Sequence, residues 1–205
     1  LTQDGAAVFA KTGLDLEVRR VAVRSPGKAR PFSLPADRLT DRPWEVVEDR
    51  TVDLVVEVMG GRDPAFDLVR GALERGKPVV TANKELIAAR GPELLDAAAR
   101  SGVPLLFEAA VGGAIPIIRP LTETLAGERV ERVMGIVNGT TNFILTRMAD
   151  EGTDFAAALA EAQELGYAEA DPTADVTGAD AASKASILAS LAFATCVAPD
   201  RVFPE

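Results

Sequence analysis

The sequence contains no histidine and only one cysteine among its 205 residues. The absence of histidine excludes Ser-His-Asp and Cys-His catalysis and argues against a zinc site. The single cysteine, Cys196, excludes an internal disulfide and suits a reducing cytoplasm, the location that we expect. Its apolar neighbours predict that Cys196 is a small core residue. Acid–base chemistry therefore falls to Lys, Asp, Glu, Tyr or water.

The sequence also lacks long apolar runs and an excess of positive charge. No run approaches the length of a membrane-spanning helix. The net charge of −9 argues against a surface for nucleic acid or an anionic membrane. Because 47% of the residues are hydrophobic, a substantial core is still possible. We therefore expect neither a nucleic-acid nor a membrane partner.

No G-x-G-x-x-G motif occurs, although strands and helices alternate through the first half of the chain. The predicted strands are Leu16–Arg24, Val52–Val58, Pro78–Thr81 and Val103–Phe107. The predicted helices are residues 1–12, Trp44–Glu48, Pro64–Arg75 and Asn83–Arg100, and residues 25–43 read as a loop. This alternation predicts an α/β protein with a Rossmann-like, doubly wound parallel sheet that lacks its first strand. The strand ends at Arg24, Gly60 and Asn83 would share one ligand-binding edge.

The pattern changes at Glu108, where a glycine-rich apolar segment begins. Helices are predicted at Pro116–Ala126, Asn138–Glu151 and Asp154–Leu165, and a strand at Val130–Val137. We place a domain boundary near residue 107. The expectation is an incomplete nucleotide-binding domain at 1–107 and an incomplete α+β domain at 108–205; only a family resemblance implies that the second is the catalytic and dimerisation domain.

An acidic loop with Glu169 and Asp175 leads into a final helix that carries Asp180 and Lys184. At 100° per residue, these two charged residues share a stripe with apolar residues, Ile187 among them, so the pair is expected to face the protein body or a cleft. The alternative is an ordinary surface pair, with Asp180 closing a capping box from Thr177. Burial favours the functional reading, because an unpaired buried lysine is costly.

This stretch resembles the signature of homoserine dehydrogenases, whose fixed places are filled by Ala162, Gly166, Tyr167, Asp171, Pro172, Asp175, Val176, Gly178, Asp180 and Lys184. The resemblance implies NAD(P)-dependent, reversible oxidation of L-homoserine to L-aspartate 4-semialdehyde, a step of threonine, methionine and isoleucine biosynthesis. Lys184 would be the general acid and base, with Asp180 beside it. Lys84, in Thr81-Ala-Asn-Lys84, resembles the lysine between nicotinamide and substrate; the alternative is an exposed lysine.

The resemblance also implies a divided amino-acid site. Glu169 would hold the substrate ammonium group, and Asp175 would lie near the hydroxyl and the lysine. Gly139 and Thr140, at a helix start that suits a carboxylate, would touch the substrate, as would Tyr167. The alternative for this helix start is simple capping by Asn138.

Cofactor and metal residues follow in the same way. Arg24, Met59 and Gly60 are expected to bind the cofactor together with Lys84, although the glycine pair after a strand is also consistent with a turn alone. A basic residue at Arg24 suits a 2′-phosphate, so we expect NADP, with NAD possible. The family's monovalent-cation loop matches Glu108, Val111, Gly113 and Ile115, which makes sodium a possible ligand; a tight interdomain loop is the alternative.

The resemblance further implies a chain truncated at both ends, since the family's glycine turn precedes this stretch and its sequence continues beyond it. Homodimers or homotetramers are expected on the same ground. Two alternatives stay open: a non-catalytic fragment, and another amino-acid dehydrogenase of the same two-domain plan. Aspartate-semialdehyde dehydrogenase is closest in chemistry, but it resembles a Cys–His enzyme and this chain has no histidine.

Overall fold

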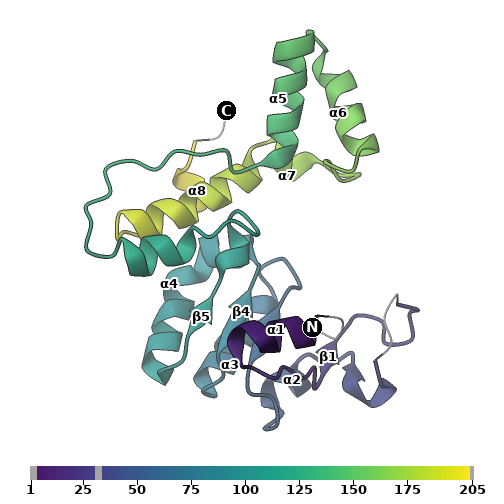
Figure 1. Cartoon of the computed structure of the whole chain (residues 1–205), viewed down its shortest axis with the longest axis vertical. Coiled ribbons are helices and arrows are strands. Elements are labelled where there is room, and N and C mark those ends of the chain that lie inside the picture. Colours follow the sequence, from purple (N-terminus) through teal and green to yellow (C-terminus); the bar gives the residue numbers. More distant parts are fainter. Residues whose placement is uncertain (1–3, 31–33, 204–205) are drawn as a thin grey trace.

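Parallel strands form the centre of the first half of the chain, as the sequence predicts (Figure 1). The computed structural model describes residues 4–30 and 34–203. One sheet contains, in this order, β3 (Val55–Glu57), β4 (Val79–Thr81) and β5 (Leu105–Leu106). A second sheet pairs β1 (Val21–Ala22) with β2 (Leu39–Thr40). Parallel sheets joined through helices confirm the α/β class.

The helices of this half lie before β1 or connect successive strands. They are α1 (Gly5–Thr12), α2 (Trp44–Glu48), α3 (Ala65–Glu74) and α4 (Lys84–Ser101). Glu57 pairs in register with Thr81, so β3 and β4 end at the same edge of the sheet. Because α4 begins just after β4, its N-terminus and the loop after β3 lie at that edge. A functional site at this edge can draw on both segments.

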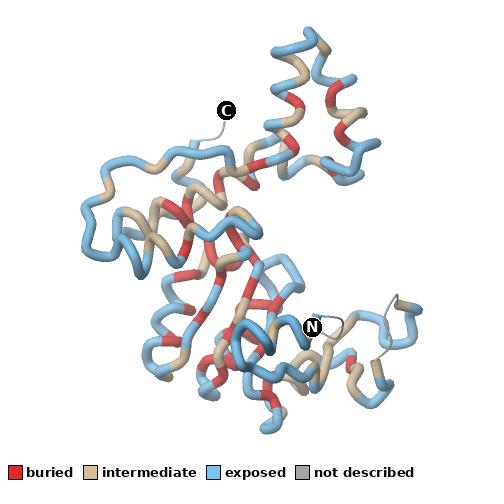
Figure 2. The backbone as a smooth tube through the Cα atoms, viewed as in Figure 1, coloured by how far each residue is buried: buried red, intermediate tan, exposed pale blue. Residues whose placement is uncertain are grey.

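The main hydrophobic core lies between the three-stranded sheet and helices α3, α4 and α8 (Ala179–Ala192). Figure 2 shows the buried residues concentrated around β4 and the helices packed on it. Leu73, Val79, Leu86 and Leu94 have no exposed surface. Full burial of such a side chain contributes about 1.5–3 kcal/mol, so this core fixes the frame on which α4 and α8 sit.

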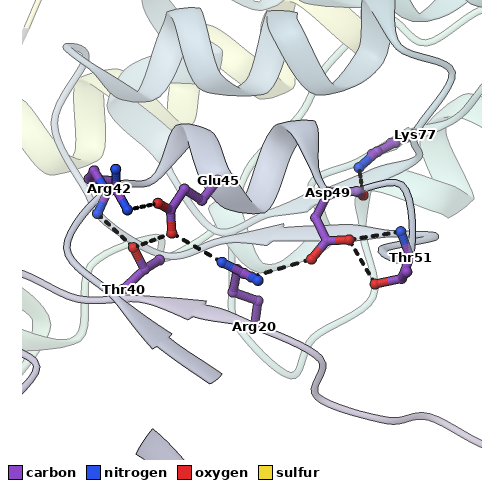
Figure 3. Close-up of polar contacts among 7 residues, drawn as sticks. All are labelled: Arg20, Thr40, Arg42, Glu45, Asp49, Thr51 and Lys77. Carbon is purple, nitrogen blue, oxygen red and sulfur yellow. Dashed lines mark hydrogen bonds and ion pairs between the residues drawn. The ribbon is translucent and has the colours of Figure 1, made fainter. Parts of the chain in front are cut away.

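A polar network attaches the two-stranded sheet to the rest of this half (Figure 3). The Arg20 guanidinium lies 3.0 Å from Glu45 Oε2 and 3.3 Å from Asp49 Oδ2. The Thr40 hydroxyl donates to Glu45 over 2.8 Å, and Lys77 Nζ donates to the Asp49 carbonyl oxygen. Strand β2, helix α2 and the segment before β4 are thereby linked through side chains.

Within the described residues, the second half contains helices and irregular connections but no strand. It contains a short π-helix, Pro120–Thr124, followed by α5 (Gly139–Glu151), α6 (Phe155–Glu164), α7 (Thr173–Val176) and α8. Helices α5 and α6 form a hairpin at one end of the molecule (Figure 1), with its own small cluster around Ile144, Ala158 and Ala162. Ile187 and Leu188 of α8 join the main core instead. None of the helices in residues 4–30 and 34–203 is both long and apolar enough to cross a membrane.

The predicted strand Val130–Val137 is wrong, because this segment has no regular secondary structure. Figure 1 shows it within a long irregular connection that leads into α5. Met134 and Ile136 are 80% and 78% exposed. Alternating apolar residues favour a strand only where a neighbouring strand accepts the backbone hydrogen bonds, and this segment has no such neighbour among the described residues.

Other segments are shorter or differently placed than predicted. Only Val21–Ala22 of the predicted strand Leu16–Arg24 pairs, and its partner β2 lies in the segment expected to be a loop. Of the predicted helix Pro116–Ala126, only residues 118–124 are helical: two α-helical residues, Ile118 and Arg119, followed by the π-helix Pro120–Thr124. Cys196 is exposed rather than part of the core, because it follows the end of α8. The first three residues of the predicted helix 1–12 and the last two of the chain lie outside the described residues.

Candidate active site

Asp180 is the centre of a cluster of charged and polar side chains from three helix starts. It is 3% exposed. Lys184 Nζ lies 2.7 Å from its Oδ2, and Lys84 Nζ forms an ion pair with its Oδ1. Asn138 Nδ2 donates to Oδ2 over 2.8 Å. One buried carboxylate therefore holds two ammonium groups from different parts of the chain.

Helix α8 places Asp180 and Lys184 one turn apart on its inward face. Ile187, on the same stripe, is 3% exposed and belongs to the main core, so the predicted inward orientation is confirmed. The alternative, a capping box from Thr177, is absent: the cap residue is Gly178 at φ 74°, and Thr177 donates its hydroxyl to the Thr173 carbonyl instead. Because no side chain caps the start of α8, the Asp180 carboxylate is available to the two lysines.

Helix α4 brings the second lysine to the cluster. Asn83 caps this helix, as its residue type predicts, and accepts from the Leu86 N–H over 3.1 Å. A lysine in the first turn is disfavoured by the helix dipole. The ion pair between Lys84 and Asp180 compensates for that position, so Lys84 is not simply an exposed lysine.

Asn138 caps α5, as the alternative interpretation of this helix start has it, and its side chain also makes a second set of contacts. Its Oδ1 accepts from the Thr141 N–H over 2.8 Å, as a cap does. Its Nδ2 donates to Asp175 over 2.6 Å and to Asp180 over 2.8 Å. Nothing in the spacing distinguishes this asparagine from an ordinary cap, so no sequence signal could have revealed its contact with Asp180.

The two lysines open onto a cleft of about 450 Å³. It is lined by Ala82, Lys84, Ala109, Ala110, Gly112, Gly113, Ile115, Ile136, Val137, Gly139 and Lys184. Lys184 Nζ donates to the Val137 carbonyl oxygen over 2.7 Å as well as to Asp180. Since an ammonium group has three donors, one N–H of Lys184 is left for a group in the cleft.

The charges of the cluster favour an oxygen-rich, partly negative ligand. Burial raises the pKa of Asp180, but hydrogen bonds from Lys184, Lys84 and Asn138 favour the charged form, and the pKa lies below the usual value. With Asp180 ionised, two ammonium groups face one carboxylate. The cleft is therefore suited to orient an alcohol or carbonyl oxygen and to exchange a proton with it.

The residues expected to bind an amino acid lie around the start of α5 and on the acidic loop. Gly139 lines the cleft, whereas Thr140 is buried and donates its hydroxyl to the Tyr167 carbonyl over 2.7 Å. The exposed Tyr167 ring stacks on Phe143 with 4.9 Å between centroids. Glu169 is exposed, and its described hydrogen bond uses only its backbone carbonyl.

The residues expected to bind a cofactor lie at strand ends. Met59 and Gly60 follow β3, and Met59 is 46% exposed. Gly60 and Gly61 have φ of 76° and 72°, and no atom lies within 4 Å of the place where either Cβ would be. Arg24 follows β1 and is exposed. The geometry leaves open space beside the glycine pair for close approach of a ligand.

Glu108 uses its carboxylate to hold the start of the next helical segment. It accepts N–H groups of Ile117, Ile118 and Arg119 over 2.6, 2.8 and 3.0 Å. Burial raises the pKa of Glu108, but these donors outweigh it and hold the pKa below its usual value. The other predicted metal residues, Val111, Gly113 and Ile115, lie on the following loop, where Val111 is buried and the other two are exposed.

Comparisons with known proteins agree over nearly the whole chain. A family model for the homoserine dehydrogenase NAD-binding domain matches residues 2–108, and a homoserine dehydrogenase model matches residues 116–205. The chain is 56% identical to a homoserine dehydrogenase of Mycobacterium tuberculosis strain H37Rv, covering 96% of this chain and 44% of that protein. It is 48% identical to one of Bacillus subtilis, covering 89% and 42%.

Solved structures give the same result. A homoserine dehydrogenase from Thiobacillus denitrificans superposes with a TM-score of 0.88 at 45% identity, covering 100% of this chain and 47% of that one. A hyperthermophilic archaeal homoserine dehydrogenase in complex with NADPH superposes with a TM-score of 0.70 at 33% identity, covering 93% and 54%. The chain thus spans less than half the length of the curated relatives named above.

Proposed function

Because this chain belongs to the homoserine dehydrogenase family, we propose that the whole protein interconverts L-homoserine and L-aspartate 4-semialdehyde with a nicotinamide cofactor. The observation that carries the proposal is the Lys84–Asp180–Lys184 cluster beside the cleft. Asp180 holds both lysine side chains, and the Val137 carbonyl also accepts from Lys184. Both side chains would face the alcohol oxygen that loses a proton in the reaction. The reaction would serve threonine, methionine and isoleucine biosynthesis.

Lys184 is the proposed proton carrier. In homoserine oxidation the neutral amine form of Lys184 accepts the hydroxyl proton, directly or through water, and in the reverse direction its ammonium form returns that proton to the carbonyl oxygen. Lys84 holds the same oxygen and stabilises its negative character. Asp180 positions both lysines and balances their charge. The cofactor supplies the hydride acceptor for the C4 carbon when it is bound.

The residues after β3 fit a nicotinamide cofactor. Left-handed Gly60 and Gly61 leave open space that side chains would fill, and Met59 is exposed beside them. These features support Met59, Gly60 and Lys84 as cofactor contacts. The archaeal relative that was solved with NADPH supports the same class of cofactor.

The proposed substrate site divides the amino acid between two signs of charge. The first N–H groups of α5, at Gly139 and Thr140, have no intrahelical acceptor and suit the substrate carboxylate. Glu169 is proposed to hold the ammonium group, with Tyr167 beside it on the same loop. Asp175, linked to Asp180 through Asn138, is proposed to lie near the hydroxyl.

A steady-state assay of the whole enzyme with homoserine and either NADP or NAD tests the proposal. Reduced cofactor should form only when both substrates are present, and the product should be a semialdehyde. A folded protein without this activity would favour the alternative of a non-catalytic protein. Oxidation of another amino acid, with no oxidation of homoserine, would favour a different dehydrogenase of the same two-domain plan.

Arg24 should decide the choice of cofactor. Its exposed guanidinium follows β1, where a base accommodates a 2′-phosphate, and Arg30 donates to the carbonyls of Ser25, Pro26 and Lys28 and so shapes the adjacent loop. Arg24→Ala is expected to raise KM for NADP by about tenfold or more, because a charge-assisted contact is lost. KM for NAD should change little.

The matched control is Arg19→Ala, which removes an exposed arginine paired with Glu17 on the same segment. It should leave both cofactor constants unchanged. Equal kcat/KM for NADP and NAD in the wild type, or no effect of Arg24→Ala, would reject NADP selection by Arg24.

Glu169→Ala is expected to raise KM for homoserine by roughly 10–100-fold with little change in kcat. The substrate ammonium group is present in both the ground state and the transition state. Losing its charged partner therefore weakens the binding of both states equally. Steady-state kinetics at saturating NADP measures both constants. Glu164→Ala, an exposed glutamate at the end of α6, is the control and should leave KM unchanged. A fall in kcat with KM unchanged would contradict the assignment.

Sodium is proposed for the loop that follows Glu108. Backbone carbonyls of Val111, Gly113 and Ile115 would provide hard oxygen donors, the type that such cations prefer, and Glu108 would provide the negative charge. Three N–H groups already occupy its carboxylate, which leaves acceptor capacity mainly on Oε2. We also propose a homodimer or homotetramer, on the ground of the family. A cytoplasmic location is proposed because a single cysteine suits a reducing compartment.

A further inference from the structure

A buried glutamate at the end of β3, Glu57, is not used by the chemistry above. It is 3% exposed, and its described partners are neutral donors rather than lysine or arginine. Burying a carboxylate without a cationic partner is costly unless its oxygens are well hydrogen-bonded. Its place at the ligand-binding edge of the sheet suggests that these hydrogen bonds organise that edge.

The Glu57 carboxylate connects two strand ends. Its Oε2 accepts from the hydroxyl of Thr81 over 2.6 Å, and Thr81 is its register partner in β4 with no exposed surface. Its Oε1 accepts from the Met59 N–H over 2.7 Å. The carboxylate therefore fixes both the last residue of β4 and the first turn of the loop after β3.

Asn83 extends this connection to helix α4. Its Nδ2 donates to the Gly61 carbonyl over 2.6 Å and lies 3.5 Å from Glu57 Oε1. Its Oδ1 caps α4 through Leu86, and its own N–H donates to Thr81 over 3.0 Å. One side-chain amide thus holds the far end of the glycine pair and the start of the helix that carries Lys84.

We propose that Glu57, Thr81 and Asn83 form a positioning unit that sets the loop Met59–Gly61 at a fixed place relative to Lys84. This inference rests on the proposed function, in which the loop contacts the cofactor and Lys84 contacts the substrate oxygen. Glu57 acts through its neighbours and is a positioning residue, not a catalytic one. Both of its carboxyl oxygens are used as acceptors, one for the Met59 N–H and one for the Thr81 hydroxyl.

One feature of the loop and one of Lys84 make such a unit necessary. Gly60 and Gly61 lack side chains that could anchor the loop in the core, and glycine has the largest conformational freedom of any residue. Lys84 has a long side chain that is 35% exposed. Because displacement of reacting groups by about 1 Å is enough to lower rates strongly, the start of α4 must be held independently of substrate.

The test uses Glu57→Gln and Thr81→Val in the whole enzyme. The amide nitrogen of glutamine cannot accept from Thr81, and valine keeps the shape of threonine without its hydroxyl. Each variant is expected to raise Kd for NADPH, followed by cofactor fluorescence without substrate, by about tenfold. Each should also lower kcat by about tenfold, because Lys84 is displaced. Thr81→Ser keeps the hydroxyl, so Kd for NADPH and kcat should stay at their wild-type values.

Ser186→Ala is the control for a purely structural effect. It removes another hydroxyl that is 1% exposed and donates over 2.6 Å, here to Val197 near the C-terminal end of α8. It should lower the melting temperature without changing Kd for NADPH or kcat. A comparable loss of melting temperature in Thr81→Val, with wild-type Kd and kcat, would overturn the inference.

The outcome is separable from that of the proposed function. A wild-type enzyme that oxidises homoserine, together with unchanged Kd and kcat in Glu57→Gln and Thr81→Val, rejects the positioning unit alone. A wild type that binds NADPH without oxidising homoserine rejects the proposed function, while the effect of the two variants on Kd still decides whether the unit positions the loop.

Discussion

Replacing Lys184 by alanine in the whole enzyme is expected to lower kcat by on the order of 10²–10⁴. Lys184 Nζ lies beside Asp180 and the Val137 carbonyl, with one N–H left for the cleft. Removing the proposed proton carrier acts on the transition state, so kcat and kcat/KM should fall together while Kd for the cofactor stays nearly unchanged. Steady-state kinetics, with a melting curve alongside, measures the effect.

The chain offers a closely matched control on α3. Arg70 and Glu74 form an i,i+4 pair at the same 2.7 Å as Lys184 and Asp180, but these side chains are 50% and 47% exposed. An exposed pair of this kind contributes about 1 kcal/mol or less, so Arg70→Ala should leave kcat unchanged and alter stability slightly. Wild-type kcat in a folded Lys184→Ala variant would end the catalytic assignment.

The second large effect is expected from Asp180→Ala, which removes the one carboxylate that holds both lysines. The ammonium groups of Lys84 and Lys184 would then repel each other, and Asn138 would lose an acceptor. Removing one partner of a buried ion pair costs roughly 3 kcal/mol, here at the low end because Lys84 is partly solvated. We expect a lower melting temperature and a fall in kcat of about 10² or more.

Asp180→Asn separates charge from shape, and its pH dependence has a definite sign. The pKa of Asp180 is lowered in the folded protein, so its stabilisation is present above the unfolded pKa and is lost as pH falls through the folded pKa. The stability gap between wild type and Asp180→Asn should be constant at neutral pH and should shrink below about pH 4. Glu74→Ala is the exposed control. A gap that widens in acid would contradict this account of the cluster.

Local patterns predicted the elements whose cause is local. Continuous apolar runs placed β3, β4 and β5, and helical spacing placed α3 and α4. The inward orientation of Asp180 and Lys184 followed from the apolar stripe that they share with Ile187. The start of α4 followed from Asn83, a residue type that prefers the cap position.

Features that depend on distant partners could not be predicted in this way. Lys84 meets Asp180 only because α4 packs on α8, and Asn138 reaches Asp180 from a third helix start. Val130–Val137 has a strand-like pattern but finds no paired strand among the described residues. In each of these cases tertiary contacts decide, and the residue spacing contains no information about them. The cap at Gly178 has a local cause instead, because a left-handed glycine turns the chain between α7 and α8.

The contact between α4 and α8 makes the proposed reaction centre depend on both halves of the chain. Lys84 lies in the segment matched by the NAD-binding family model, whereas Asp180 and Lys184 lie in the segment matched by the other model. A chimera that exchanges one segment between relatives therefore has to reproduce the α4–α8 packing as well as each fold. Grafting must preserve the spacing between two helices before any property of the cofactor or the substrate can be transferred.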